Sequence, residues 1–310
     1  MRIQRAELTF LLAGVEPAIA NSLRRAMLAE VPTLAIEFVT MEENSSGMED
    51  DFLVQALGLV PIRFSDVEDV FLLDRFVFHE ECVCAERCAK CSVTFRLDVE
   101  NLTDVPIPVT SADLVLVDER ADVQVGHFSC PEEQADLSEF DPGVRIVMLA
   151  PGKAIHAECI ATVGTGKRCA KWSPVCACAY KYEFDIRLDE EMADALAPVD
   201  RLAVMRGAQP GIFVVDATGR LRVAADAGLR LRSPDVLEHS VMKLGHQGLV
   251  SVTVLPQRYW FKVETIGSLT PVQVFMYAVE GLLRKMAILT ESVTRCRQVA
   301  DKLPKPAPGL

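Results

Sequence analysis

The chain has 310 residues and a mass of 34.1 kDa, which at about 150 residues per domain predicts two domains. Half of the residues are hydrophobic and a quarter are charged, a composition that excludes global disorder. Lys and Arg number 32 and Asp and Glu number 44, so the formal net charge is −12. Such acidity argues against a surface that binds nucleic acid through its phosphates, and 6% aromatic residues argue against extended base stacking. We therefore expect no direct contact with DNA.

The N-terminal segment fits two interpretations. Residues 8–15 form a short apolar run, and residues 18–20 resemble a signal-peptidase site. On the other hand, Leu8, Phe10 and Leu12 alternate as on one side of a β-strand, and acidic residues flank the run. We favour the strand. No apolar run reaches the ~18 residues that cross a bilayer, so we expect no membrane span.

The first helix is predicted to begin at Pro17, a residue that suits the first turn, and to end at Pro32. Its apolar stripe repeats every fourth residue: Ile19, Leu23, Met27 and Val31. Arg24 and Arg25 fall beside this stripe on the polar side. After the helix we expect a strand over residues 34–39 and a polar loop over residues 41–51.

The middle of the chain is predicted to be rich in β-structure. Residues 92–190 contain short alternating runs separated by turn signals at residues 151–152 and 164–166. Residues 190–235 show only weak periodicity, and within them residues 216–219 favour a hairpin turn.

The longest predicted helix lies near the C-terminus. Thr270 offers an N-cap, Pro271 the first helical residue and Gln273 the second half of a capping box. An apolar stripe follows at spacings of three and four residues: Val272, Phe275, Val279, Leu282, Met286 and Leu289. A stripe that continues to about Val293 requires a partner helix. The proline-rich residues 301–310 are predicted to be a disordered tail.

Four of the ten cysteines fall within ten residues, with the spacing C-x-C-x3-C-x2-C: Cys82, Cys84, Cys88 and Cys91. Four thiolates this close can surround one ion, and four sulfur ligands favour zinc. Arg87 and Lys90 lie inside the loop and offset the net negative charge of such a site. With four protein ligands the site is closed, which predicts a structural role rather than a catalytic one.

Other states of these cysteines remain open. Disulfides are less expected in a reducing compartment, an iron–sulfur cluster does not match the ferredoxin spacings, and the loop could bind no metal at all. Cys176 and Cys178 alternate with small apolar residues as on a buried strand face, and we favour this over a second metal site that would include Cys169.

The sequence contains no motif for catalysis by this chain alone: no P-loop, dinucleotide fingerprint, nucleophile elbow or zinc-protease motif. The five histidines show no ligand spacing. Two acidic runs, residues 49–51 and 189–191, are expected to be solvated faces rather than Mg²⁺ sites. A free-standing zinc enzyme would need an open coordination position and a base, and neither is indicated.

Several segments resemble the α-like subunits of cellular RNA polymerases. Residues 21–36 resemble the opening helix of that family, residues 56–62 the segment that follows, and residues 261–269 the strand and turn before its last helix. Residues 167–175 are similar to its Lys-x-His-Ala-Lys-Trp-x-Pro motif, with Cys169 in the place of the histidine. The cysteine spacing resembles the zinc loop of the third-largest subunits of eukaryotic RNA polymerase II.

The resemblance implies an α+β fold with a discontinuous α-like dimerisation domain and an inserted β-rich domain that carries one structural Zn²⁺. We expect residues 1–41 and 178–300 to form the dimerisation domain and residues 42–177 the insert. The archaeal D-type α-like subunit and the α-like subunit shared by polymerases I and III are the alternatives within the family. A free-standing zinc enzyme or a zinc adaptor are the alternatives outside it.

The resemblance also implies a non-catalytic assembly subunit, located in the nucleus. It implies a heterodimer with a small α-like subunit, docking of the second-largest subunit, and contact with small zinc-containing polymerase subunits. The residues predicted at the subunit interface are Leu23, Arg24, Arg25, Met27, Phe275, Val279, Leu282 and Met286. An ordinary intrachain core for the apolar ones, and a solvated face for the two arginines, are equally compatible with the sequence.

Overall fold

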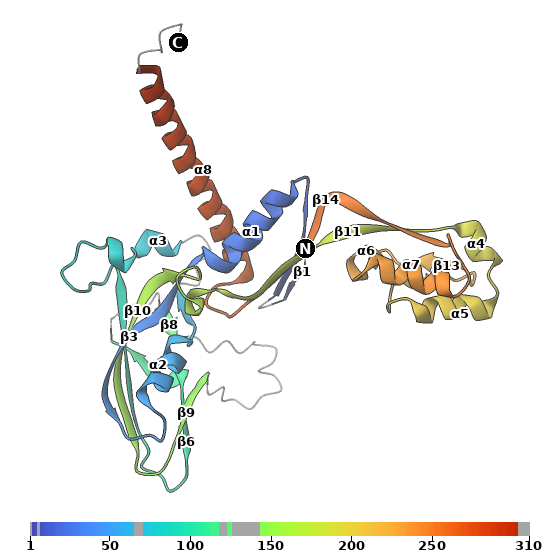
Figure 1. Cartoon of the computed structure of the whole chain (residues 1–310). Coiled ribbons are helices and arrows are strands. Elements are labelled where there is room, and N and C mark those ends of the chain that lie inside the picture. The colour runs from blue at the N-terminus through green and yellow to red at the C-terminus, as the bar shows by residue number, and fades with distance from the viewer. Residues whose placement is uncertain (1, 5–6, 65–70, 118–122, 126–142, 303–310) are drawn as a thin grey trace, which may run out of the picture. The chain divides into compact units, whose positions relative to one another are not determined.

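The computed structural model describes residues 2–4, 7–64, 71–117, 123–125 and 143–302 (Figure 1). The chain divides into two compact units. Residues 9–20 and 179–262 form the small unit, and residues 2–8, 21–178 and 263–310 form the large unit. Among the described residues, no helix is both long and apolar enough to cross a membrane.

Helices and strands alternate irregularly along the chain, as expected for an α+β fold. The N-terminal part contains β1 (Arg2–Gln4), β2 (Glu7–Ala13), α1 (Pro17–Ala29), β3 (Pro32–Asn44), α2 (Asp50–Gly58), β4 (Ile62–Phe64) and α3 (Leu72–Arg75). The middle contains η1 (His79–Glu81), β5 (Ser92–Glu100), β6 (Ile107–Thr110), η2 (Ser111–Asp113), β7 (Leu114–Leu116), β8 (Val123–Val125), β9 (Arg145–Leu149), β10 (Ala154–Thr165), η3 (Ala170–Trp172) and β11 (Val175–Leu188). The C-terminal part contains α4 (Glu190–Ala195), α5 (Pro198–Gly207), β12 (Phe213–Val215), β13 (Leu221–Val223), α6 (Ala227–Arg230), α7 (Pro234–Lys243), β14 (Val250–Thr265) and α8 (Pro271–Lys302).

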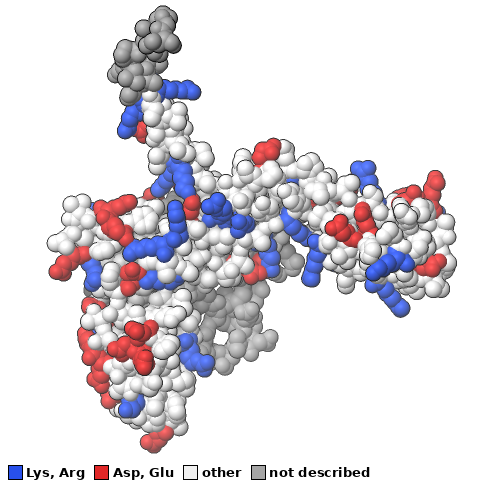
Figure 2. Space-filling view, in the orientation of Figure 1, with Lys and Arg blue, Asp and Glu red and all other residues white. Residues whose placement is uncertain are grey.

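The large unit is built on a four-stranded sheet with the order β3-β10-β5-β7, in which neighbouring strands are antiparallel. In β5, Phe95 and Leu97 are buried while Arg96 and Asp98 are exposed, so the strand has one apolar and one polar side. On the polar side, Arg96 forms ion pairs with Asp98 and with Glu42 of β3. Acidic side chains gather over this part of the large unit (Figure 2). The predicted β-structure after residue 92 is confirmed here.

The polar loop predicted over residues 41–51 is wrong at both ends. The strand β3 continues to Asn44, and α2 already begins at Asp50. Negative side chains stabilise the N-terminus of a helix, so Asp50 and Asp51 in the first turn favour α2 rather than a loop. Leu53 and Leu57, one helical turn apart, are its buried residues together with Gly58.

The small unit combines strands with a set of short helices. Strands β2, β14 and β11 are neighbours in a sheet of order β1-β2-β14-β11, which confirms the strand expected over residues 8–12. Phe10 of β2 stacks on Phe261 of β14 with ring centroids 5.0 Å apart. The hairpin turn expected at residues 216–219 is also confirmed, since β12 and β13 pair on either side of it.

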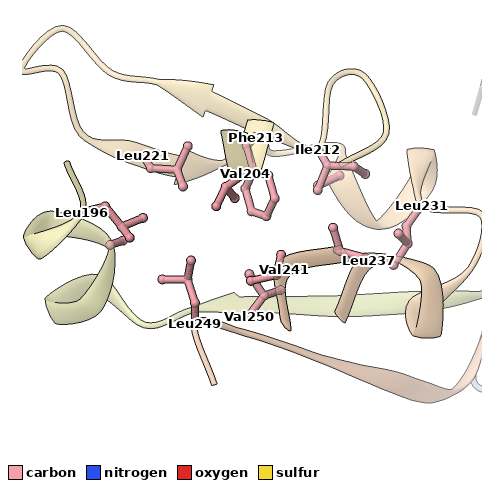
Figure 3. Close-up of a cluster of buried hydrophobic side chains, with 12 residues drawn as sticks. Leu196, Val204, Ile212, Phe213, Leu221, Leu231, Leu237, Val241, Leu249 and Val250 are labelled. Carbon is pink, nitrogen blue, oxygen red and sulfur yellow. The ribbon is translucent and has the colours of Figure 1, made fainter. Parts of the chain in front are cut away.

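The core of the small unit is formed by α4, α5, α6 and α7 together with residues of β11, β12, β13 and β14 (Figure 3). Its buried residues are Ala193, Leu196, Val204, Ile212, Phe213, Leu221, Ala227, Leu231, Leu237, Val241, Leu249 and Val250. The helices have only 4 to 10 residues, and each contributes one or two of these side chains. Helices this short cannot repeat an apolar stripe, which explains the weak periodicity of residues 190–235.

The two long helices differ from their predictions in detail. Pro17 begins α1 and Pro271 begins α8, as predicted, but Ile19 is 54% exposed and does not belong to the buried stripe of α1. The next residue, Ala20, is fully buried, so the covered side of the first turn is the one that carries Ala20. The helix α8 continues to Lys302 rather than ending near Val293, so the first residues of the predicted tail are helical. Residues 303–310 lie outside the described residues.

The predicted domains differ from the two compact units. The prediction places residues 1–41 and 178–300 in one domain and residues 42–177 in the other. The boundary between residues 41 and 42 falls inside β3. The boundary between residues 177 and 178 lies one residue from a boundary between the units. The domain division itself stays a prediction.

Candidate metal centre and dimerisation helices

Four cysteine sulfurs come together in the loop between η1 and β5. The Sγ atoms of Cys82, Cys84, Cys88 and Cys91 all lie within 4.8 Å of one another. The Cys82–Cys88, Cys84–Cys91 and Cys88–Cys91 sulfurs are 3.6, 3.7 and 3.8 Å apart. Zn–S bonds of about 2.3 Å in a tetrahedron place the sulfurs about 3.8 Å apart. The four thiols therefore fit one tetrahedral metal ion.

Short-range hydrogen bonds fold this loop. The backbone N–H groups of Cys91 and Ser92 donate to the carbonyl oxygen of Cys88 over 2.9 and 3.0 Å. The N–H of Val77 donates to the carbonyl of Lys90 over 2.9 Å, which joins the two ends of the loop. Cys91 is buried and directly precedes the sheet strand β5, and the other three cysteines are half-buried. The sheet thus holds one end of the metal loop in place.

Three of the four thiols have shifted pKa values. A hydrogen bond from the backbone N–H of Lys90 lowers the pKa of Cys88 to about 7. Hydrogen bonding with Cys82 raises the pKa of Cys84 to about 12, and burial raises the pKa of Cys91. Because the thiolate is the metal ligand, the lowered pKa favours binding of a cation by Cys88 at neutral pH.

The loop also contacts β3 through its charged residues. The guanidinium of Arg87 lies 4.4 Å above the ring of Phe38, a cation–π contact. His79 of η1 packs edge-on against the same ring at 6.1 Å. These contacts fix the outer part of the loop against the sheet. Among the described residues no second group of three or more His, Cys, Asp or Glu side chains has this geometry.

The predicted interface residues of α1 have different environments. Leu23 and Met27 are 4% and 0% exposed, so the chain itself buries them. Arg24 is half-buried and donates two hydrogen bonds to the side-chain oxygen of Asn21, whereas Arg25 is exposed. Burial within the chain agrees with the intrachain alternative for Leu23 and Met27. A role for the four residues at a subunit interface stays a prediction.

The predicted interface residues of α8 are much more accessible. The capping box is confirmed, since the N–H of Thr270 donates to Gln273 Oε1 over 2.9 Å and the N–H of Gln273 donates to Thr270 Oγ1 over 3.2 Å. Phe275, Val279 and Leu282 are half-buried, and Met286 is 59% exposed. Every residue from 283 to 298 is exposed. The apolar stripe of this helix is therefore largely open to solvent.

Comparison with known families matches this architecture to one of them. A model described as the RNA polymerase Rpb3/Rpb11 dimerisation domain matches residues 9–286. The chain belongs to the RNA polymerase Rpb3/Rpb11 dimerisation-domain family. This match covers both units, α1, the cysteine loop and the first half of α8.

Several relatives of the chain are named as polymerase subunits. The chain is 30% identical over 287 residues to DNA-directed RNA polymerase II subunit rpb3 of Dictyostelium discoideum, which covers 92% of this chain and 91% of the relative. It is 31% identical over 280 residues to subunit 3 of RNA polymerases II, IV and V of Arabidopsis thaliana, covering 89% and 85%. Subunit Rpo3 of the archaeal polymerase of Methanothermobacter thermautotrophicus is 32% identical over 194 residues, covering 63% and 64%.

In this member of the Rpb3/Rpb11 family, residues 167–175 connect the end of α1 to the sheet. The hydroxyl of Ser173 donates to the carbonyl of Leu28 over 3.1 Å, and the N–H of Lys167 donates to the carbonyl of Ala29 over 2.8 Å. The indole N–H of Trp172, a fully buried side chain, donates to the carbonyl of Thr162 over 3.1 Å. A segment recognised by resemblance alone thus has a physical role: it holds the C-terminal end of α1.

Charged residues of the same segment contact β3 and η1, the short helix that precedes the metal loop. Arg168 forms ion pairs with Glu37 of β3 and Glu80 of η1, and Lys171 pairs with Glu37. The ammonium of Lys171 also lies 4.5 Å from the ring of Trp172. Sequence reasoning missed this network because its members are far apart in the chain.

The other cysteines in the described part of the chain form no metal-ligand group. Cys169, which stands where the family motif has histidine, is exposed, and its carbonyl accepts a hydrogen bond from the N–H of Trp172. The predicted burial is confirmed for Cys178 and wrong for Cys176, which is exposed and donates to the carbonyl of Glu264 over 3.4 Å. The two acidic runs lie at the N-termini of α2 and α4, where Asp189 caps α4 by accepting from the N–H of Met192.

Proposed function

We propose that the chain is an Rpb3-type assembly subunit of DNA-directed RNA polymerase II, without catalytic activity of its own. The family match across both units and relatives of matching length support this function. The alternatives of a free-standing zinc enzyme or a zinc adaptor are not favoured, because the family model and the relatives reported above are named for polymerase subunits.

The subunit acts by pairing. Its partner is a small α-like subunit of the Rpb11 type, and the pair then docks the second-largest polymerase subunit. The observation that carries this proposal is the exposed apolar stripe of α8, in which Met286 is 59% and Leu289 56% exposed. Large apolar patches exposed on one side of an element mark protein–protein interaction sites. Arg24 and Arg25 belong to the same proposed interface, and the buried Leu23 and Met27 support it from the core of the chain.

The cysteine cluster binds one structural Zn²⁺ in this proposal. Cys82, Cys84, Cys88 and Cys91 occupy all four positions of a tetrahedral ion, so the metal stabilises the loop and offers no position to a substrate. The separations of the sulfurs support zinc, and the pairing of the loop with β3 explains how metal binding stabilises the large unit. An iron–sulfur cluster is the outcome that metal analysis would have to exclude.

We further propose that the assembled subunit works in the nucleus, contacts small zinc-containing polymerase subunits and touches no DNA directly. The net charge of −12 supports the last point, since phosphate binding requires basic surface.

Co-expression tests the pairing. Expressed alone, the chain should be poorly soluble, because the stripe of α8 is uncovered; co-expressed with the Rpb11-type subunit of the same genome, it should purify as a 1:1 complex. A stable, monodisperse monomer that does not bind the Rpb11-type subunit would contradict the proposal. Affinity purification of the tagged chain from its own cells should recover the second-largest polymerase subunit.

A further inference from the structure

The helix α7 of the small unit has two different faces. Leu237 and Val241, one turn apart, are buried in the core of that unit (Figure 3). The second face consists of residues spaced three, one and three positions apart, which fall on one side of a helix: Asp235, Glu238, His239 and Met242. All four of these side chains are exposed. The helix therefore presents a polar face that the core does not use.

This second face lines a hollow with a volume of about 390 Å³. The other wall consists of residues 246–248, in the loop after α7, and residues 250–251 at the start of β14. Val241 and Val250 also line the hollow and are only 3% and 7% exposed, so its deepest part is apolar. The volume lies within the range usual for ligand sites, roughly 300–1,000 Å³.

The backbone fixes the shape of the hollow. Gly245 and Gly248 have φ angles of +85° and +86°, which glycine adopts readily, and these angles turn the chain back along α7. From the helix, Glu238 Oε1 accepts a hydrogen bond from the N–H of Val252 in β14 over 2.9 Å. The helix wall and the strand wall are therefore joined, and the hollow is a built feature of the small unit.

The lining of the hollow carries negative charge. Asp235 and Glu238 lie one helical turn apart, and no Lys or Arg side chain lines the hollow. Within the described part of the chain, Asp235 forms no hydrogen bond or ion pair, and Glu238 forms no ion pair. Two carboxylates without a counter-charge attract a cation and repel an anion.

The lining favours an organic cation over a metal ion. Around the hollow, no three His, Asp or Glu side chains of the described residues bring their ligand atoms within 4.8 Å of one another. An arginine side chain suits the lining better, because its apolar stem can pack on Val241 and Val250. Its guanidinium is planar and weakly hydrated, pairs with carboxylates and stacks on aromatic rings such as those of His239 and His246. The ammonium of a lysine is compact and strongly hydrated, and makes less use of these rings.

We propose that the hollow between α7 and β14 binds an arginine side chain of a partner protein. Arginine anchors seated in pockets are common at the centre of protein interfaces. Val236 and Leu244, next in sequence to the second face and the loop wall, are 56% and 40% exposed and offer apolar contacts to the neighbours of that arginine. The inference concerns the small unit and does not depend on the proposed pairing through α8.

Methionine-methyl NMR of the full chain measures this binding, in the complex with the Rpb11-type subunit or on the chain alone if that is soluble. The probe is a blocked pentapeptide with one arginine between two leucines. It should shift the Met242 signal, assigned with Met242→Leu, in a saturable way, and leave the signal of Met205 in the core of the small unit unchanged. The same peptide with citrulline, which lacks the charge, should bind about fivefold more weakly.

Charge-removing variants locate the site. Asp235→Asn should weaken binding of the arginine peptide about threefold, and Glu238→Gln in addition should weaken it further, because the glutamine oxygen can still accept from the N–H of Val252. Asp200→Asn is the control, since Asp200 also lies in the first turn of a helix of the small unit but outside the hollow. It should leave the affinity unchanged.

Several outcomes would overturn the proposal. An unmoved Met242 signal, or equal affinity for the arginine and citrulline peptides, would show that the hollow does not bind the cation. Equal weakening by Asp235→Asn and Asp200→Asn would show that the peptide binds elsewhere. A saturable response to Zn²⁺ alone, without a response to the peptide, would make the hollow a metal site. Arginine amide that binds as tightly as the peptide would make it a small-molecule site rather than a docking site.

Discussion

The helices α1 and α8 have apolar stripes of similar spacing, yet they differ in how far their own chain buries them. Met27 in α1 is fully buried by its own chain, whereas Met286 in α8 is 59% exposed. The end of α1 is held by hydrogen bonds from Ser173 and Lys167, whereas the second half of α8 leaves the rest of the large unit (Figure 1). An apolar stripe therefore predicts that a helix face will be covered, but not whether the same chain or another one covers it.

The largest expected effect is the loss of zinc from the metal loop, which should leave α1 and α8 unaffected. Cys88→Ser should lower the zinc content from about one ion per chain to nearly none and unfold the loop, because binding of a structural zinc contributes ~10 kcal/mol to local folding. Pairing through α8 should survive. Elemental analysis and co-purification with the Rpb11-type subunit measure the two effects. Cys176→Ser, outside the cluster, is the control. An unchanged zinc content in the Cys88→Ser variant would show that Cys88 is not a zinc ligand.

The next effect contrasts the two methionines directly. Met27→Ala should destabilise the chain by about 2–5 kcal/mol, since it leaves a cavity in a closed core. Met286→Ala should change the stability of the chain alone by about 0.5 kcal/mol at most, because the side chain is largely in solvent, and should weaken heterodimer formation instead. Urea unfolding and binding measurements on the same samples test both. Equal destabilisation by the two variants would contradict the difference between the helices.

A smaller effect tests how the end of α1 is held. A Cβ atom at residue 164 would overlap the indole ring of Trp172, while one at residue 47 would meet open space. Gly164→Ala should therefore cost about 1–3 kcal/mol through overpacking, and Gly47→Ala should be nearly neutral. Thermal unfolding distinguishes them. A neutral Gly164→Ala variant would mean that the Trp172 anchor yields easily and does not fix α1.

The smallest expected effect concerns the pH dependence of stability in the small unit. It arises from hydrogen bonds between residues that are close in sequence. Asp216 accepts hydrogen bonds from the hydroxyl and N–H of Thr218 and from the N–H of Arg220, which lower its pKa from 3.8 to about 2. A carboxyl group whose pKa is lower in the folded chain than in the unfolded chain stabilises the folded state when the pH is above the unfolded-state pKa. This contribution to stability is lost as the pH falls from about 4 toward 2. Asp216→Asn should remove that dependence from the β12–β13 hairpin. An NMR titration of the Asp216 carboxyl that gives an ordinary pKa would contradict it.

Much of the fold could be predicted because its signals are local. The caps of α8, the proline that begins α1, the alternation in β5 and the cysteine spacing all depend on residues a few positions apart. The sequence pattern does not indicate helix α2, because its acidic first turn resembles a solvated loop. It also predicts too short a helix α8, because after Val293 the apolar stripe continues only with the small side chain of Cys296.

The remainder depends on contacts between distant residues. The ion pairs of Arg168 with Glu37 and Glu80 join positions 131 and 88 residues apart, and no local pattern indicates them. The core of the small unit draws single side chains from several short helices, so its members show no shared period. The distinction between Met27 and Met286 likewise arises only when the chain has folded around one of them.

Amide hydrogen exchange along α8 tests the central claim most directly. In the chain alone, residues 283–298 should exchange quickly, because an exposed helix without packing opens readily. Addition of the Rpb11-type subunit should slow exchange across this whole segment while the buried part of α1 around Met27 changes little. If the heterodimer forms and residues 283–298 exchange as fast as before, the stripe of α8 is not the interface and the account is wrong.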